Sequence, residues 1–140
     1  MIEVSETRDV AACLAIRRAV FIEEQGVDEA IEMDGLEEQG IHVLAAVCGA
    51  PVGCARILLS PPVGKVGRVA VLKSHRGTGI GQAVMAECER LLREKSQITE
   101  IRLGAQSYVV RFYEALGYRV DGAEYIEADI PHRPMVMEIG

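Results

Sequence analysis

Three glycines at alternate positions stand in the segment Arg76-Gly77-Thr78-Gly79-Ile80-Gly81. Glycine has no Cβ, so its backbone can turn sharply and let a ligand approach the main-chain N–H groups. The segment follows the apolar run Val69-Ala70-Val71-Leu72 and opens a long amphipathic stretch, an order that predicts a strand, a loop and a helix. Because the first N–H groups of a helix lack partners and carry partial positive charge, we expect this loop to hold the pyrophosphate of a large cofactor.

The residues around the glycines narrow the choice of cofactor. A nucleoside-triphosphate loop needs Lys-Ser or Lys-Thr after its last glycine, whereas Gln82-Ala83 follows here. A dinucleotide loop reads G-x-G-x-x-G, whereas this one reads G-x-G-x-G. A glycine-rich helix start without any ligand is the remaining alternative, and the backbone entropy that each glycine costs disfavours it.

The composition indicates one soluble domain over residues 1–140. A hydrophobic fraction of 49% is ample for one core, and a net charge of −6 argues against general binding to nucleic acid. No apolar run approaches the length of a membrane span, and the N-terminus does not have the pattern of a signal peptide, so we expect a cytoplasmic protein that uses no membrane. A homodimer stays open.

The cysteines and histidines do not suggest a metal site. Cys13, Cys48, Cys54 and Cys88 show no metal-binding spacing and are expected to be buried free thiols. The three histidines are scattered along the chain, so we expect no metal.

The loop must be positioned by the elements around it. A helix is expected from about Arg8, with Thr7 as its cap, and a short helix within the acidic segment 23–38. Two further helices are expected, from Ile80 to about Lys95 and from Ser107 through Leu116. The pattern predicts an α/β fold with a mixed antiparallel and parallel sheet of six to seven strands, flanked by about four helices on both faces. The expected strands are 2–4, 41–47, 52–59, 66–72, 98–105, 118–120 and 134–139.

This order of elements and two motifs resemble the GNAT superfamily of N-acetyltransferases. The first motif runs from Val69 through Gly81, and the second is Phe112-Tyr113-Glu114-Ala115-Leu116-Gly117-Tyr118. Within the superfamily the chain is similar to the ElaA/YjcF-like proteins. That similarity lies in Arg17…Val20-Phe21…Glu24-Gln25, Gly67-Arg68-Val69-Ala70-Val71, Ala105-Gln106, His132 and Met135.

The resemblance implies an enzyme that moves an acetyl group from acetyl-CoA to a primary amine of an unidentified acceptor. In the family, the backbone of the strand at Val69, Ala70 and Val71 pairs with the pantetheine arm, and an N–H there polarises the thioester carbonyl. The N–H groups of Arg76, Gly77, Thr78, Gly79, Ile80 and Gly81 would bind the pyrophosphate. Gln106 stands where many members carry an asparagine that touches the arm. It could instead cap the next helix.

Tyr113 matches the tyrosine that often protonates the departing CoA thiolate. The ordinary pKa values of a phenol, about 10, and of a thiol, about 8.5, are close enough for that proton to be shared. Packing beside Phe112 is the alternative role.

Attack on a thioester requires a neutral amine and therefore a base. Glu24, Asp34, His42 and His132 are candidates, and spacing singles out none of them. The carboxylates of segment 23–38 would attract a cationic amine near Glu24 and Asp34, or would form a solvated acidic face. Arg17 and Arg56 would bind an anionic part of the acceptor, or pair with the acidic segment. A non-catalytic CoA-binding sensor or interaction module is the alternative to an enzyme.

Overall fold

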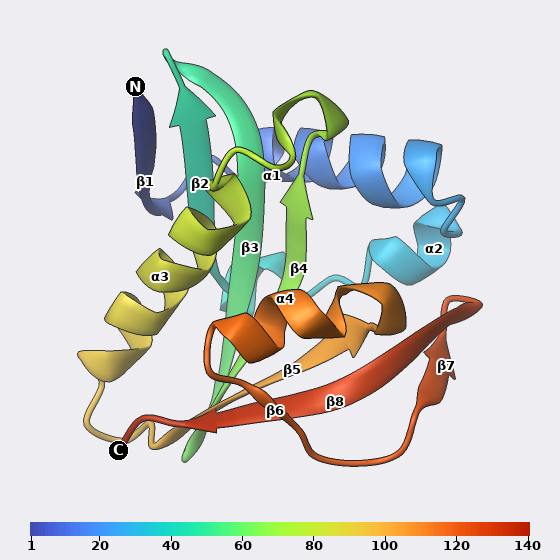
Figure 1. Ribbon diagram of the computed structural model, residues 1–140. Helices are drawn as coiled ribbons and strands as arrows, with labels where there is room; N and C mark the ends of the chain where they lie inside the picture. Colours follow the sequence, from blue (N-terminus) through green and yellow to red (C-terminus); the bar gives the residue numbers. More distant parts are fainter.

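The computed structural model describes residues 1–140 and arranges the chain around one sheet of eight strands (Figure 1). The strand order is β1-β2-β3-β4-β5-β8-β6, with β7 paired to β8. Only β4 and β5 run parallel and the other pairs are antiparallel, so the sheet is mixed, as predicted. The predicted count of six to seven strands was too low. The strands are β1 (Ile2–Thr7), β2 (Ile41–Val47), β3 (Ala50–Ser60), β4 (Val63–Val71), β5 (Glu100–Gln106), β6 (Arg119–Val120), β7 (Tyr125–Glu127) and β8 (Ile130–Glu138).

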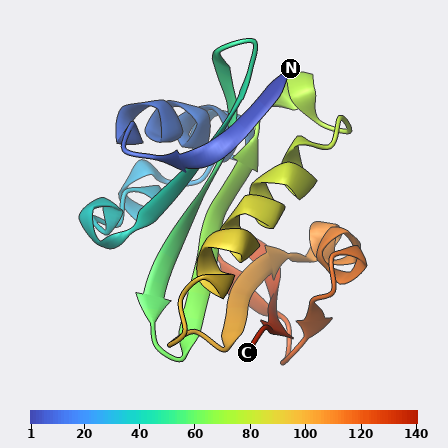
Figure 2. The ribbon, with the colours of Figure 1, turned by 90° about the vertical axis from the view of Figure 1, so that its left-hand side faces the viewer.

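Helices cover both faces of this sheet, as the sequence predicted (Figure 2). One face carries the first helix and its continuation, and the opposite face carries α3. None of these helices is both long and apolar enough to cross a bilayer. The α-helices are α1 (Val10–Arg17), α2 (Glu29–Glu32), α3 (Ile80–Arg93) and α4 (Val110–Ala115), the π-helix is η1 (Arg18–Glu24), and the 3-10 turns are η2 (Glu37–Gln39), η3 (Lys73–His75) and η4 (Ser107–Val109).

The helix α1 begins at a different cap from the one predicted. The carboxylate of Asp9 accepts from the N–H of Ala12 at 3.1 Å, whereas Thr7 accepts from the N–H of Asp9 one turn earlier. Asp9 is therefore the N-cap of α1, and the Thr7 hydroxyl only accepts a hydrogen bond from the backbone of Asp9. Beyond Arg17 the helix continues as the π-helix η1, a wide form that is often found at functional sites.

The core has two parts, one on each side of the sheet. The larger part lies under α3, whose buried residues recur at the helical spacing that predicted them. The smaller part lies under α1 and contains Cys13, Ile16, Val20, Cys54 and Ala70. Cys88 is buried as well, but Cys48 is exposed in the turn after β2, so the prediction of a buried thiol was wrong for that residue.

The strands β4 and β5 separate soon after they meet (Figure 1). Their parallel pairing covers only Val63–Lys65 opposite Glu100–Arg102, so the later halves of both strands have no pairing with each other. A β-bulge bends β4 at this point, and Arg68 in the bulge has a φ of 52°. A non-glycine residue in the left-handed region stores strain, and such strain gathers at functional sites. The two strands therefore form a V that opens toward the glycine loop.

A hairpin that the sequence analysis missed closes one side of this V. The strands β7 and β8 are joined by Ala128 and Asp129, which both have positive φ, as the tightest hairpin turns require. Tyr125 of β7 lies directly over Gly104 of β5, where any Cβ would collide with its hydroxyl. Glycine at position 104 therefore allows the hairpin to lie against β5.

Candidate active site

A cleft of about 760 Å³ runs through the V between β4 and β5. Its walls come from the second half of β4, the glycine loop, the end of β5, α4, the segment after η1, and the β7–β8 hairpin. Most predicted site residues line it: Val69, Ala70, Val71, Arg76, Gly77, Gly79, Gly81, Gln106, Tyr113, Asp34, Arg56 and His132. Arg17, Glu24, His42, Thr78 and Ile80 do not.

The glycine loop presents a row of unused donors to this cleft. The six consecutive amides from Gly77 to Gln82 donate to no acceptor within the protein, whereas Ala83 is the first to bond, to the carbonyl of Gly79 at 3.1 Å. Gly77 and Gly79 have φ values of 75° and 88°, which only glycine adopts at low cost. An anion at this helix start would receive several N–H groups and the favourable end of the dipole of α3.

The other residues of the loop support this shape. The hydroxyl of Thr78 donates to the carbonyl of His75 at 2.5 Å, which ties the turn together. Ile80 is buried and anchors the start of α3 in the core. Gly81 keeps α3 close to α4, because a Cβ there would lie 3.1 Å from the ring of Phe112.

Arg76 is held between two acceptors. Its Nε donates to the carbonyl of Val71 at 3.0 Å, and its two terminal nitrogens bond the carboxylate oxygens of Glu24 at 2.5 and 2.6 Å. This guanidinium lowers the pKa of Glu24, mainly through those hydrogen bonds. A carboxylate with a lowered pKa is a poorer proton acceptor, so the geometry disfavours Glu24 as the base.

Tyr113 lies on α4 and is 7% exposed, with its ring in edge contact with Phe112 and Tyr118. Burial raises the pKa of Tyr113 well above its ordinary value. The phenol therefore stays protonated and able to donate. It is also a weaker acid than the sequence argument assumed, so full proton transfer to a thiolate is less favourable than a shared hydrogen bond.

Gln106 at the end of β5 forms a reciprocal amide pair with Gln25. The Nε2 of Gln106 donates to Gln25 at 2.9 Å, and the Nε2 of Gln25 donates back at 3.2 Å. Gln25 also donates to the hydroxyl of Tyr108 at 3.1 Å. Gln106 does not act as a simple helix cap, since its side chain makes no capping bond to η4.

His132 of β8 lines the cleft opposite Gln106, its pairing partner at the end of β5. Its Nδ1 lies 2.7 Å from the carbonyl of Ile130, so Nδ1 carries the hydrogen and Nε2 is left as an acceptor. The ring stacks on Tyr125 at 5.5 Å, and Nε2 lies 3.8 Å from a carboxylate oxygen of Glu127. The free Nε2 of His132 therefore lies near a solvent-exposed carboxylate.

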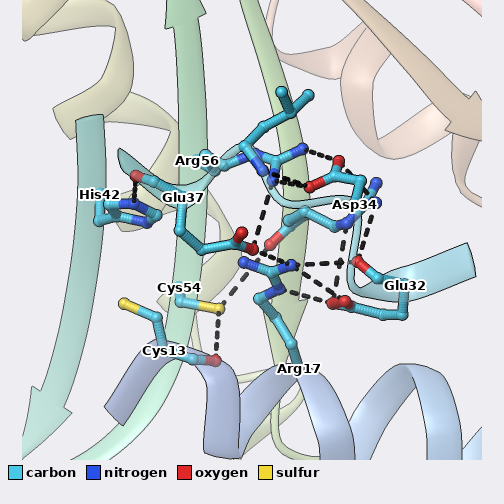
Figure 3. A network of polar contacts seen from close by, with 10 residues as sticks. Cys13, Arg17, Glu32, Asp34, Glu37, His42, Cys54 and Arg56 are labelled. Atoms are coloured by element: carbon cyan, nitrogen blue, oxygen red, sulfur yellow. Dashed lines mark hydrogen bonds and ion pairs between the residues drawn. The ribbon is translucent and has the colours of Figure 1, made fainter. Parts of the chain in front are cut away.

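Three arginines pair with Glu32, Asp34 and Glu37 of the acidic segment, and Figure 3 labels two of them, Arg17 and Arg56. Arg17, which is 1% exposed, binds the buried Glu32 at 2.5 Å and 2.9 Å and also reaches Glu37 at 2.9 Å. Arg56 binds both oxygens of Asp34 at 2.8 and 2.7 Å. These contacts form structural ion pairs. Arg17 is not among the residues that line the cleft.

Arg68 completes this network from the bulge of β4. It reaches Asp34 at 3.1 Å and the main-chain oxygen of Glu32 at 3.1 Å. The hydrogen bonds from Arg56 lower the pKa of Asp34 far below its ordinary value, so this carboxylate is no base near neutral pH. His42 is also turned away, since its Nε2 contacts the carbonyl of Glu37 at 2.9 Å.

The sequence analysis did not assign Gln25, Arg68 and Tyr125 to the site. Gln25 and Arg68 stood inside the segments that carried the family resemblance, but neither had a partner within the same segment. Tyr125 had no signal at all, because its hairpin turn has neither glycine nor asparagine.

Known proteins are similar to this chain in sequence and in fold. The Acetyltransferase (GNAT) domain family matches residues 5–139. The N-acetyltransferase YjcF of Bacillus subtilis is 36% identical, with 88% of each chain covered. ElaA of Escherichia coli is 33% identical over 91% of this chain and 86% of its own.

Solved structures agree with the sequence relatives. The crystal structure of ElaA superposes with a TM-score of 0.84, covering 97% of this chain and 99% of that one. An aminoglycoside 6′-N-acetyltransferase complexed with coenzyme A shares the fold at a TM-score of 0.78 and 19% identity, covering 98% and 97% of the two chains. The chain therefore belongs to the GNAT family of acetyltransferases, among the ElaA/YjcF-like proteins.

Proposed function

We propose that the cleft binds acetyl-CoA and transfers its acetyl group directly to a primary amine. The observation that carries this proposal is the row of six unbonded amides from Gly77 to Gln82 at one end of the cleft. These donors suit a diphosphate, and Gln106 and Tyr113 line the same cleft. When bound, acetyl-CoA supplies an acyl carbon whose C–S bond breaks as the C–N bond to the amine forms.

The residues around the glycine loop fit the coenzyme. Nothing lies within 4 Å of the positions where Gly77 and Gly79 would carry a Cβ, so the backbone is open to close approach. The backbone of β4 from Val69 to Val71 has no pairing with β5 and borders the cleft. Main-chain donors there would stabilise negative charge on the thioester oxygen.

Tyr113 would act on the leaving sulfur. Its hydroxyl stays protonated because burial raises its pKa, and it would donate a hydrogen bond to the thiolate as the C–S bond breaks. Because Tyr113 is largely buried, its hydroxyl would stabilise developing charge more strongly than a donor in bulk solvent would.

His132 would receive the proton that the acceptor ammonium loses before it attacks, and the second N–H proton, lost as the amide forms, would go to the leaving thiolate. The tautomer fixed by Ile130 leaves Nε2 with a lone pair, and Glu127 stands 3.8 Å away to stabilise the imidazolium that results. Glu24, Asp34 and His42 are less suited, because each is bound to another group of the protein.

The acceptor would enter beside α2 and the β7–β8 hairpin. Ile31, Leu36 and Tyr125 line this mouth along with the Asp34–Arg56 pair, and all three are partly exposed. A small or peptidic amine would place its apolar part on these side chains and its amino group near His132.

Thiol release from acetyl-CoA tests the function. The purified protein would be incubated with acetyl-CoA and a panel of small amines, aminosugars and peptides with free N-termini, and free CoA would be measured. Release that depends on one class of amine is expected. Calorimetric binding of CoA with no release across the panel would instead favour the non-catalytic CoA-binding module, and no binding of CoA would refute both.

A further inference from the structure

The end of η1 contacts both arms of the V, although it belongs to the opposite face from α3 and α4. Glu24 binds Arg76, which follows β4, at 2.5 and 2.6 Å. The next residue, Gln25, binds Gln106 at the end of β5 and Tyr108 in the turn beyond it. Two adjacent residues thus join two strands that have stopped pairing with each other.

The contacts with Gln25 leave part of the Gln106 amide free to bind a ligand. A glutamine amide has two N–H donors and a carbonyl with two lone pairs. Gln25 has used both of its donors, one on Gln106 and one on Tyr108. Gln106 has used one donor and one lone pair on Gln25, so one N–H and one lone pair remain, and its side chain lines the cleft.

We propose that Gln25 is a positioning residue for the coenzyme arm, and that it acts by fixing the amide of Gln106. This inference rests on the proposed function. The pantetheine arm of CoA contains two amide groups, so an oriented side-chain amide can both donate to and accept from it. Without Gln25, the Gln106 side chain would regain its rotamers and would have to be ordered anew at each binding event.

The contact between Glu24 and Arg76 lies on the β4 side of the V. It would affect the pyrophosphate of the coenzyme rather than the pantetheine. Arg76 belongs to the loop with the unbonded amides, so Glu24 influences the phosphate end. Its carboxylate also brings a negative charge close to where the pyrophosphate would lie, and this charge repels an anion.

Binding of two probes, CoA and ADP, distinguishes effects on the pantetheine arm from effects on the pyrophosphate. ADP has the diphosphate but no pantetheine arm. For Gln25→Ala we expect the dissociation constant of CoA to rise about fivefold to tenfold, the effect of one ordered neutral hydrogen-bonding group, with that of ADP unchanged. For Glu24→Gln we expect both probes to bind more tightly by a similar factor.

A double-mutant cycle links Gln25 to Gln106. Gln106→Ala should weaken CoA by a similar factor, and the double variant should be no weaker than Gln106→Ala alone, because Gln25 acts only through Gln106. Glu23→Gln, a neighbouring exposed residue of η1, is the matched control and should change neither constant.

Several outcomes would overturn the inference. If Gln25→Ala binds CoA with the wild-type dissociation constant, Gln25 does not position the coenzyme arm. If it weakens CoA and ADP equally, the substitution has damaged the cleft in general and the inference is also wrong. Thermal unfolding checks that the variants are folded. If Gln25→Ala does not fold, Gln25→Met, which keeps the length of the side chain, must give the same selective loss. Wild-type protein that fails to bind CoA would instead refute the proposed function.

Discussion

Replacing Arg17 by methionine should destabilise the fold far more than any surface ion pair does. The Arg17 side chain is 2% exposed and binds Glu32, whose side chain is 3% exposed, at 2.5 Å. After Arg17→Met, the buried carboxylate of Glu32 keeps only the Nε of Arg68 at 3.7 Å. Leaving one partner of a buried pair alone costs about 3–5 kcal/mol, a large share of the roughly 5–15 kcal/mol that holds a domain together.

Equilibrium unfolding in urea measures this loss. With an m-value on the order of 2 kcal/mol/M, the expected cost moves the midpoint down by about 2 M. The matched control is Arg18→Met, because Arg18 is the next residue and its ion pair with Glu29 has side chains that are 51% and 56% exposed. That variant should cost less than about 1 kcal/mol.

The double variant Arg17→Met/Glu32→Met isolates the cause. It removes both buried charges and replaces them with apolar side chains of similar length, so it should recover at least half of the loss. If Arg17→Met unfolds within about 1 kcal/mol of the wild type at an unchanged m-value, the reasoning is refuted, because the pair would then not be a structural one. A double variant as unstable as the single one would locate the cost in lost packing rather than in stranded charge.

Three further predictions concern the cleft and its network. Gly79→Ala should weaken CoA binding and lower stability by about 1 kcal/mol, because the φ of 88° strains any residue with a Cβ; calorimetry and thermal unfolding measure the two effects. Tyr113→Phe should lower kcat by about tenfold to a hundredfold at an unchanged KM for acetyl-CoA, whereas Tyr118→Phe, which loses a hydrogen bond to Glu89, should mainly lower stability. Arg56 holds the folded-state pKa of Asp34 below its unfolded value, so the stability that this carboxylate contributes is complete above about pH 4 and is lost as the pH falls further. The free energy of unfolding should therefore fall less between pH 5 and pH 3 for Asp34→Asn than for the wild type.

The parts that the sequence predicted are those encoded by neighbouring residues. The glycine loop and α3 followed from the alternating glycines and from the spacing of Ile80, Val84 and Cys88, which the structure buries. Such signals lie within one or two helical turns, so one chain is enough to detect them. The mixed character of the sheet followed from strands that are neighbours in the sequence and from the long helix between two of them, but the place of β8 between β5 and β6 was not predicted.

The parts that the sequence could not predict depend on distant partners. Gln25 and Gln106 are 81 positions apart, and Glu24 and Arg76 are 52 apart. No local pattern tells which carboxylate an arginine will meet, so Arg17 was open to both an acceptor role and a structural one. The cap at Asp9 was missed because Thr7 and Asp9 are both good caps, and only the backbone geometry decides between them.

The separation of β4 and β5 explains why the N-terminal segment carries so many polar contacts. Two strands that separate lose the ladder of hydrogen bonds that would otherwise fix their distance, and a cleft for a ligand requires this loss. Other groups must then hold the open arms in place. Arg68 ties the bulge of β4 to the end of α2 and to Asp34 beyond it, and Gln25 ties the end of η1 to the end of β5. Residues 17–37 therefore link β4 and β5 through side-chain contacts at the place where the two strands no longer pair.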